Sequence, residues 1–86
     1  MHIYKVFDSA NEGRADYRGS LNDAHMSAKV GEPRANMRIE LHEIPTDKAA
    51  VLLYLNGQHI PDELMKPLRT WSLTERGGLK QISNGD

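Results

Sequence analysis

The sequence predicts an α+β fold, in which a small, mainly antiparallel sheet carries two helices on one face. Two observations lead to this prediction. Apolar and polar residues alternate as in strands near both ends and in the middle of the chain. Two segments between these strands begin with a helix-capping residue and end at a glycine. The expected element order is β(β)αβα followed by a C-terminal β-hairpin, in one domain over residues 1–82 with a frayed tail at 83–86.

Composition places the chain among small globular domains. It has 86 residues, of which 38% are hydrophobic and 27% charged, with a net charge of −1 and no cysteine. A chain this short has a thin core, so association with a partner would add stability. The first twenty residues do not form a signal peptide, and no apolar stretch approaches the roughly 20 residues that cross a bilayer. We therefore expect a cytoplasmic protein with no membrane partner.

The first half of the chain predicts a strand, a loose hairpin and a helix. Residues 1–7 are rich in β-forming types, and residues 15–18 are expected to pair back on them as a short second strand. Ser20 resembles the first residue of a capping box and predicts a helix over residues 21–30, which Gly31 ends. The face expected to pack on the sheet holds Leu21, Ala24, His25 and Ala28.

Residues 37–42 show the clearest strand pattern in the chain, because apolar and polar side chains alternate without exception. The inward row is Met37, Ile39 and Leu41, and the outward row is Arg38, Glu40 and His42. The outward row invites interpretation as an acid/base site, since a carboxylate, an imidazole and a guanidinium would project together. Solvated cross-strand charges explain the same row with fewer assumptions.

The segment from 45 to 57 joins a helix start to a run of apolar residues and a stop signal. Thr46 or Asp47 is the expected N-cap, and Asn56-Gly57 is the expected left-handed stop. A competing interpretation makes residues 51–55 a buried strand that enters an Asn-Gly hairpin turn. The helix is favoured because of the cap and because Lys, Ala and Leu have good helix propensity.

The C-terminal third predicts a loop and then a hairpin. Pro61 and Pro67 bracket a loop with at most one helical turn, and residues 70–74 and 79–82 are the expected strands. The residues expected to be largely buried are Ile39, Leu41, Leu52, Leu55 and Trp71.

The apolar helix also predicts self-association. Apolar residues from Ala49 to Leu55 extend most of the way round the expected helix, and one thin layer can cover only part of them. A homodimer through this helix would cover the rest.

Tests for chemistry in the sequence give no cofactor and no metal site. The chain has no glycine-rich phosphate loop and no nucleophile elbow. The four histidines have no metal-binding spacing; they are His2, His25, His42 and His59. A binding protein is therefore favoured over an enzyme, and the enzyme alternative rests on Glu40 and His42 with His25.

Two binding hypotheses remain. The first is a protein-binding module whose contact residues are Arg38, Glu40, His42, Arg69 and Arg76, because arginine and histidine anchor many interfaces. The alternative is a nucleic-acid-binding module that uses the basic stretch from Lys66 to Lys80. Trp71 lies within that stretch and belongs either to the core or to the surface, with the core favoured.

Three segments resemble small uncharacterised accessory proteins of bacteriophages and prophages. These segments are residues 44–52, Leu55-Asn56 and residues 70–79, and the region from 44 to 79 that contains them is close to half of the chain. The resemblance implies a protein that binds a host or defence protein, as anti-CRISPR proteins do. It transfers no site residues, because the shared positions look like determinants of the fold.

Overall fold

The computed structural model describes residues 1–31, 34–58 and 60–83. For residues 11–14, 62 and 83 it describes the backbone but not the side chains. Its α+β class and its element order confirm the prediction, including the C-terminal strand pair. The elements are β1 (His2–Asp8), β2 (Asn11–Arg18), α1 (Leu21–Lys29), η1 (Arg34–Asn36), β3 (Met37–Glu43), α2 (Lys48–Leu55), η2 (Asp62–Leu64), β4 (Lys66–Leu73) and β5 (Leu79–Ser83). Since β5 includes Ser83, only residues 84–86 of the expected tail lie outside the described part of the chain.

The strands form one five-stranded sheet in the order β2-β1-β3-β4-β5, and every pairing is antiparallel. β2 is longer than the expected 15–18, because three further residues are inserted where its register with β1 shifts between Phe7 and Asp8. Such an insertion has no periodic signature, so a short strand was the natural expectation.

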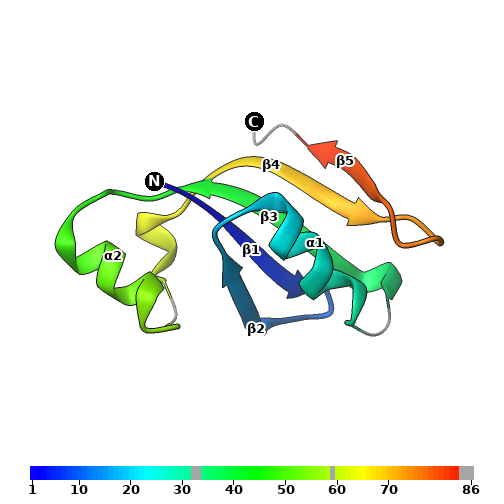
Figure 1. Cartoon of the computed structure of the whole chain (residues 1–86), viewed down its shortest axis with the longest axis horizontal. Helices are drawn as coiled ribbons and strands as arrows, with labels where there is room; N and C mark the ends of the chain where they lie inside the picture. The colour runs from blue at the N-terminus through cyan, green and yellow to red at the C-terminus, as the bar shows by residue number, and fades with distance from the viewer. Residues whose placement is uncertain (32–33, 59, 84–86) are drawn as a thin grey trace.

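Helix α1 covers one face of the sheet and forms the main core with it (Figure 1). The Ser20 hydroxyl caps the helix by accepting a hydrogen bond from the Asp23 amide at 3.1 Å, as the sequence predicts. Trp71 is 8% exposed and lies 6.1 Å from the ring of Tyr4, so it belongs to the core. The cluster comprises Val6, Ala24, Ala28, Met37, Ile39, Leu41, Trp71 and Leu73.

Helix α2 lies at the end of the sheet beside η2, apart from α1 (Figure 1). The helix interpretation is confirmed: the Asp47 carboxylate caps it, and Gly57 follows it with a φ of 65°. Its side chains pack into a second cluster around Ile3, Ile44 and Ile60. The expectation that both helices pack on the same face of the sheet therefore does not hold for α2. Ile3, around which its cluster forms, alternates with Tyr4 and Val6 along β1 and so points to the face opposite α1.

Two of the five expected core residues are not buried. Leu52 is 44% exposed and Leu55 is 68% exposed, whereas Ala50 is the one buried residue of α2. The physical reason is geometric: a helix beyond the end of a sheet is covered on one side only. Ile39, Leu41 and Trp71 are buried as expected.

The loop after α2 ends earlier than the prolines suggest. One helical turn, η2, lies between Pro61 and Pro67 as expected, but Pro67 is already part of β4. It pairs with His42 next to a register shift, and β5 pairs with β4 only from Thr70 onward. Proline is tolerated here because β4 is still an edge strand at this point.

Candidate functional site

One face of the sheet carries a row of polar side chains over its central strands. On β3, Arg38, Glu40 and His42 alternate with the core residues, as the sequence predicts. The pairing with β1 places Lys5 directly opposite Glu40. This face is the one not covered by α1, so a carboxylate, an imidazole and an ammonium group share it.

Glu40 and His42 form a hydrogen-bonded pair. The Nε2 atom of His42 lies 3.0 Å from Oε1 of Glu40. This hydrogen bond lowers the pKa of Glu40 below its ordinary value, with further help from the charges of His42 and Lys5 and against the opposing effect of burial. An ionised carboxylate only accepts hydrogen bonds, so Nε2 is the nitrogen that donates.

His42 is buried, which corrects the expectation that it projects into solvent. Its exposed fraction is 5%, and its cross-strand neighbours are Ile3 and Pro67. Its Nδ1 atom is buried with no hydrogen-bond partner in the described part of the chain. A buried ring whose side chain is hydrogen-bonded to Glu40 offers little surface to a partner.

His25, the third residue of the enzyme hypothesis, lies elsewhere. Its Nε2 atom is 2.6 Å from the carbonyl oxygen of Gly77, so it connects α1 to the turn between β4 and β5. Gly77 is buried with a φ of 84°, a conformation that favours glycine. Because α1 covers the opposite face of the sheet, His25 is not brought together with Glu40 and His42.

The three arginines of the expected contact surface also lie apart. Arg38 donates from Nη1 to the carbonyl oxygens of Ala35 and Met37, at 2.7 and 2.8 Å. Arg69 is exposed and pairs with Leu41, which places it on the face of α1 rather than with Arg38. Arg76 is exposed in the turn between β4 and β5. The five residues therefore do not form one surface.

The basic stretch from Lys66 to Lys80 divides between the two faces. Arg69 lies on the face of α1, whereas Lys80 pairs with Ser72 and lies on the other face. Trp71, the one residue of the stretch that offers a large stacking surface, is in the core. These positions remove the aromatic platform on which single-stranded nucleic acid stacks.

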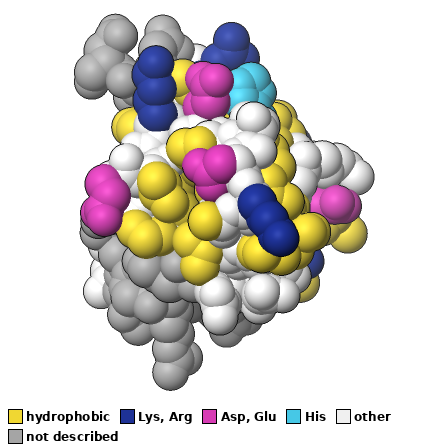
Figure 2. Space-filling model, turned by 90° about the vertical axis from the view of Figure 1, so that its left-hand side faces the viewer, with side chains coloured by type: hydrophobic (Ala, Val, Ile, Leu, Met, Phe, Trp, Pro, Cys, Tyr) yellow, Lys and Arg dark blue, Asp and Glu magenta, His cyan; other side chains and the backbone are white. Residues whose placement is uncertain are grey.

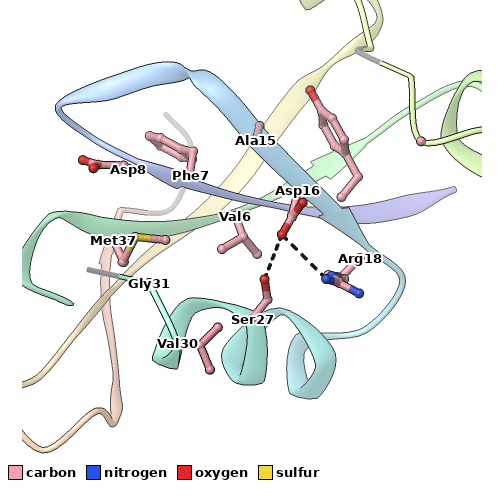
Figure 3. A pocket seen from close by; sticks show the side chains of 12 residues that line it. Val6, Phe7, Asp8, Ala15, Asp16, Arg18, Ser27, Val30, Gly31 and Met37 are labelled. Atoms are coloured by element: carbon pink, nitrogen blue, oxygen red, sulfur yellow. Dashed lines mark hydrogen bonds and ion pairs between the residues drawn. The ribbon is translucent and has the colours of Figure 1, made fainter. Parts of the chain in front are cut away.

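An open groove runs between β2 and α1 (Figure 3), with a volume of about 640 Å³. Its lining includes Val6, Val30 and Met37, and Asp16 on β2 points from the lining toward α1 (Figure 3). The Asp16 carboxylate accepts a hydrogen bond from Ser27 at 3.1 Å and lies 3.6 Å from Arg18. Its charge is compensated within the fold, so these contacts stabilise the junction of strand and helix.

The exposed side of α2 is a hydrophobic surface at one end of the molecule. Figure 2 faces this end and shows apolar side chains gathered there, with acidic and basic side chains around them. Leu52 and Leu55 are the large exposed residues, and Ala49 beside them is exposed as well. Lys48, also exposed, begins the helix. We call Lys48, Ala49, Leu52 and Leu55 the α2 face.

The open edges of the sheet are interrupted. β2 has its three inserted residues, and the register between β4 and β5 shifts between Thr70 and Trp71. Bulges of this kind discourage an added strand from pairing along a sheet edge. The α2 face is therefore the better candidate for contact with another protein.

Comparison of the chain with protein-family models, with curated proteins and with solved structures gives no match. Neither helix in the described residues is long and apolar enough to cross a membrane. Among those same residues, no three histidine, aspartate or glutamate side chains are grouped so that they could hold a metal ion.

Proposed function

We propose that this chain is a non-enzymatic protein-binding module and that the α2 face is its contact surface. The observation that carries the proposal is the exposure of Leu52 and Leu55, 44% and 68%, on the helix with the most apolar sequence in the chain. Contiguous exposed apolar side chains with a charged border are typical of protein interfaces. Binding a partner would remove them from water.

The resemblance to phage and prophage accessory proteins gives this proposal a biological setting. In that setting the partner is a host or defence protein in the cytoplasm, and the chain inhibits it by stoichiometric binding, as anti-CRISPR proteins do. Residues 44–52 and Leu55-Asn56, which carry part of the resemblance, include the α2 face.

The five contact residues predicted from the sequence have different roles in this proposal. Arg69 and Arg76 are exposed, so they stay candidates for a second contact surface. Arg38, Glu40 and His42 are held by contacts within the fold, and we assign them to its stability. A nucleic-acid partner is the second candidate, supported by the exposed cations of the hairpin.

Affinity capture separates these proposals. Immobilised protein is incubated with bacterial lysate, and the captured proteins are quantified by mass spectrometry for wild type, Leu52→Ser/Leu55→Ser and Arg69→Ala/Arg76→Ala. We expect the leucine pair to lose the partner and the arginine pair to retain it, with little change between about 50 and 200 mM salt. Capture that falls steeply with salt and disappears on nuclease treatment favours the nucleic-acid alternative. Equal capture by wild type and the leucine pair refutes the α2 face.

A further inference from the structure

We infer that a second copy of this chain occupies the α2 face, in an antiparallel two-fold pair of α2 helices. The inference rests on the proposed function, since it names one partner of the same surface. Closed two-fold pairs are the commonest assemblies of soluble proteins, and they require a surface that is complementary to itself. The α2 face has that property chiefly in side-chain size, with a smaller contribution from charge.

Size complementarity follows from the spacing of the exposed residues. Ala49, Leu52 and Leu55 recur every three residues on an eight-residue helix, so they share one side of it. When two such helices cross antiparallel about an axis at Leu52, Ala49 of each copy faces Leu55 of the other. A small residue then meets a large one at both ends of the pair, and the two Leu52 side chains meet at its centre.

Charge complementarity involves Lys48. It is the first residue of α2, where the helix dipole is positive and a cation is unfavourable. In the antiparallel pair the same ammonium group lies at the C-terminal end of the other helix, where the dipole is negative. The neighbouring Asp47 carboxylate, which caps the same helix end, offsets part of this charge in both positions, so the contribution of Lys48 to the pair is small.

The size of the surface sets the expected strength. A helix of eight residues is about 12 Å long, so the pair buries less area than a standard stable interface. We expect a dissociation constant on the order of 10–100 µM, typical of a small interface. Such a dimer covers the leucines in the free protein and releases them to a partner that binds more tightly.

The experiment is sedimentation equilibrium from about 1 µM to 1 mM, a range that spans the expected constant. For wild type we expect the mass to rise from 9.7 kDa toward twice that value. In Leu55→Ala, two small residues face each other at each end of the helix pair. In Ala49→Leu, two large residues face each other there. Each variant alone should therefore self-associate at least tenfold more weakly than wild type. Thermal melts at 1 µM check that each variant is folded.

The decisive sample mixes the two variants. Ala49→Leu paired with Leu55→Ala places one large and one small residue at each contact, so the mixture should form a heterodimer of about wild-type strength. The double variant Ala49→Leu/Leu55→Ala should likewise recover the homodimer. Val30→Ala is the matched control, because Val30 is 82% exposed at the C-cap of α1, and its replacement should leave the dimer unchanged.

Two results overturn the inference: a wild-type mass of 9.7 kDa at every concentration, or dimerisation that Leu55→Ala does not weaken. Failure of the mixture to recover association refutes the antiparallel register. Suppose that wild type is monomeric. If Leu52→Ser/Leu55→Ser then fails to capture a protein that wild type captures, the second copy is wrong and the binding module stands. If the variant captures that protein as well as wild type does, both proposals fail.

Discussion

The two helices of this chain have nearly the same length and opposite relations to the core. α1 has nine residues and a polar composition, yet it buries Ala24 and Ala28 completely against the sheet. α2 has eight residues and only one charged side chain, yet Ala50 is its one buried residue. How apolar a helix is therefore does not say how deeply it is buried.

The difference between the helices comes from what lies beneath each of them. α1 lies across three strands, so a narrow stripe of small residues is enough to pack the helix closely on the sheet. α2 packs on a small cluster at the end of the sheet, which covers one side of it. An apolar side that the fold leaves uncovered points to an intermolecular role, and the following predictions test this contrast.

The largest effect is expected in the main cluster. Trp71→Ala removes a side chain that is 8% exposed and packed against Tyr4, so it should lower the free energy of unfolding by about 3–5 kcal/mol. Urea denaturation monitored by far-UV circular dichroism measures this loss. A loss below about 0.5 kcal/mol, as at surface positions, would mean that the tryptophan is not in the core.

A somewhat smaller effect is expected in the cluster beneath α2. Ile60 is fully buried there, so Ile60→Ala should destabilise the protein by about 2–3 kcal/mol. Hydrogen exchange should show amides of α2 losing protection before those of β1 and β3, because α2 is held by fewer buried contacts. Uniform loss of protection would show instead that the two clusters unfold as one unit.

The two N-caps provide a matched pair of smaller changes. Ser20→Ala removes the acceptor for the Asp23 amide, and Asp47→Ala removes the acceptor for the Ala50 amide at 2.9 Å. Each should cost about 1 kcal/mol in thermal or urea unfolding. Asp47→Asn keeps the cap without the charge and should recover most of the loss; if it does not, the interaction with the helix dipole dominates.

Leu52→Ala should cost little at low concentration. A buried leucine would cost about 2–5 kcal/mol, but Leu52 is 44% exposed, so we expect about 1 kcal/mol or less at 1 µM protein. If a second copy covers this residue, the loss should grow as the concentration rises, because dimer formation stabilises the wild type. Melting curves at low and high concentration make the comparison, and a loss above 2 kcal/mol at 1 µM contradicts the exposure.

The Glu40–His42 pair predicts a pH dependence. The pKa of Glu40 is lower in the folded than in the unfolded chain, so the stability that its carboxylate contributes is present above the ordinary glutamate pKa and is lost as the pH falls through the folded value. Wild type should therefore exceed Glu40→Gln in stability at pH 6, and the difference should shrink toward pH 3. A constant difference over this range would contradict the role of the charge.

The sequence predicts most elements because their signals are local. The alternation at 37–42 and the caps at Ser20 and Asp47 act between residues close in the chain, and the structure reproduces all three. The strand predictions fall short where bulges intervene, as in β2 and at Pro67, because a bulge depends on the neighbouring strand.

The candidate site was less predictable than the fold. Strand alternation correctly placed Arg38, Glu40 and His42 on one face, but it could not show that His42 is buried and Glu40 half-buried there. Strand alternation places two apolar residues, Ile3 and Phe7, on the same face as Lys5, and both are buried there. Arg69 and Arg76 were grouped with that face by residue type, which says nothing about register.

The sequence by itself determined where this chain turns, caps and alternates, because these choices depend on backbone sterics and on contacts a few residues apart. Only the tertiary structure decided that His25 lies at the hairpin turn, that His42 is buried and that Leu52 and Leu55 remain in contact with solvent. These outcomes depend on which segments meet in space. Burial is a property of the whole packing arrangement, and a local pattern specifies a face without specifying what covers it.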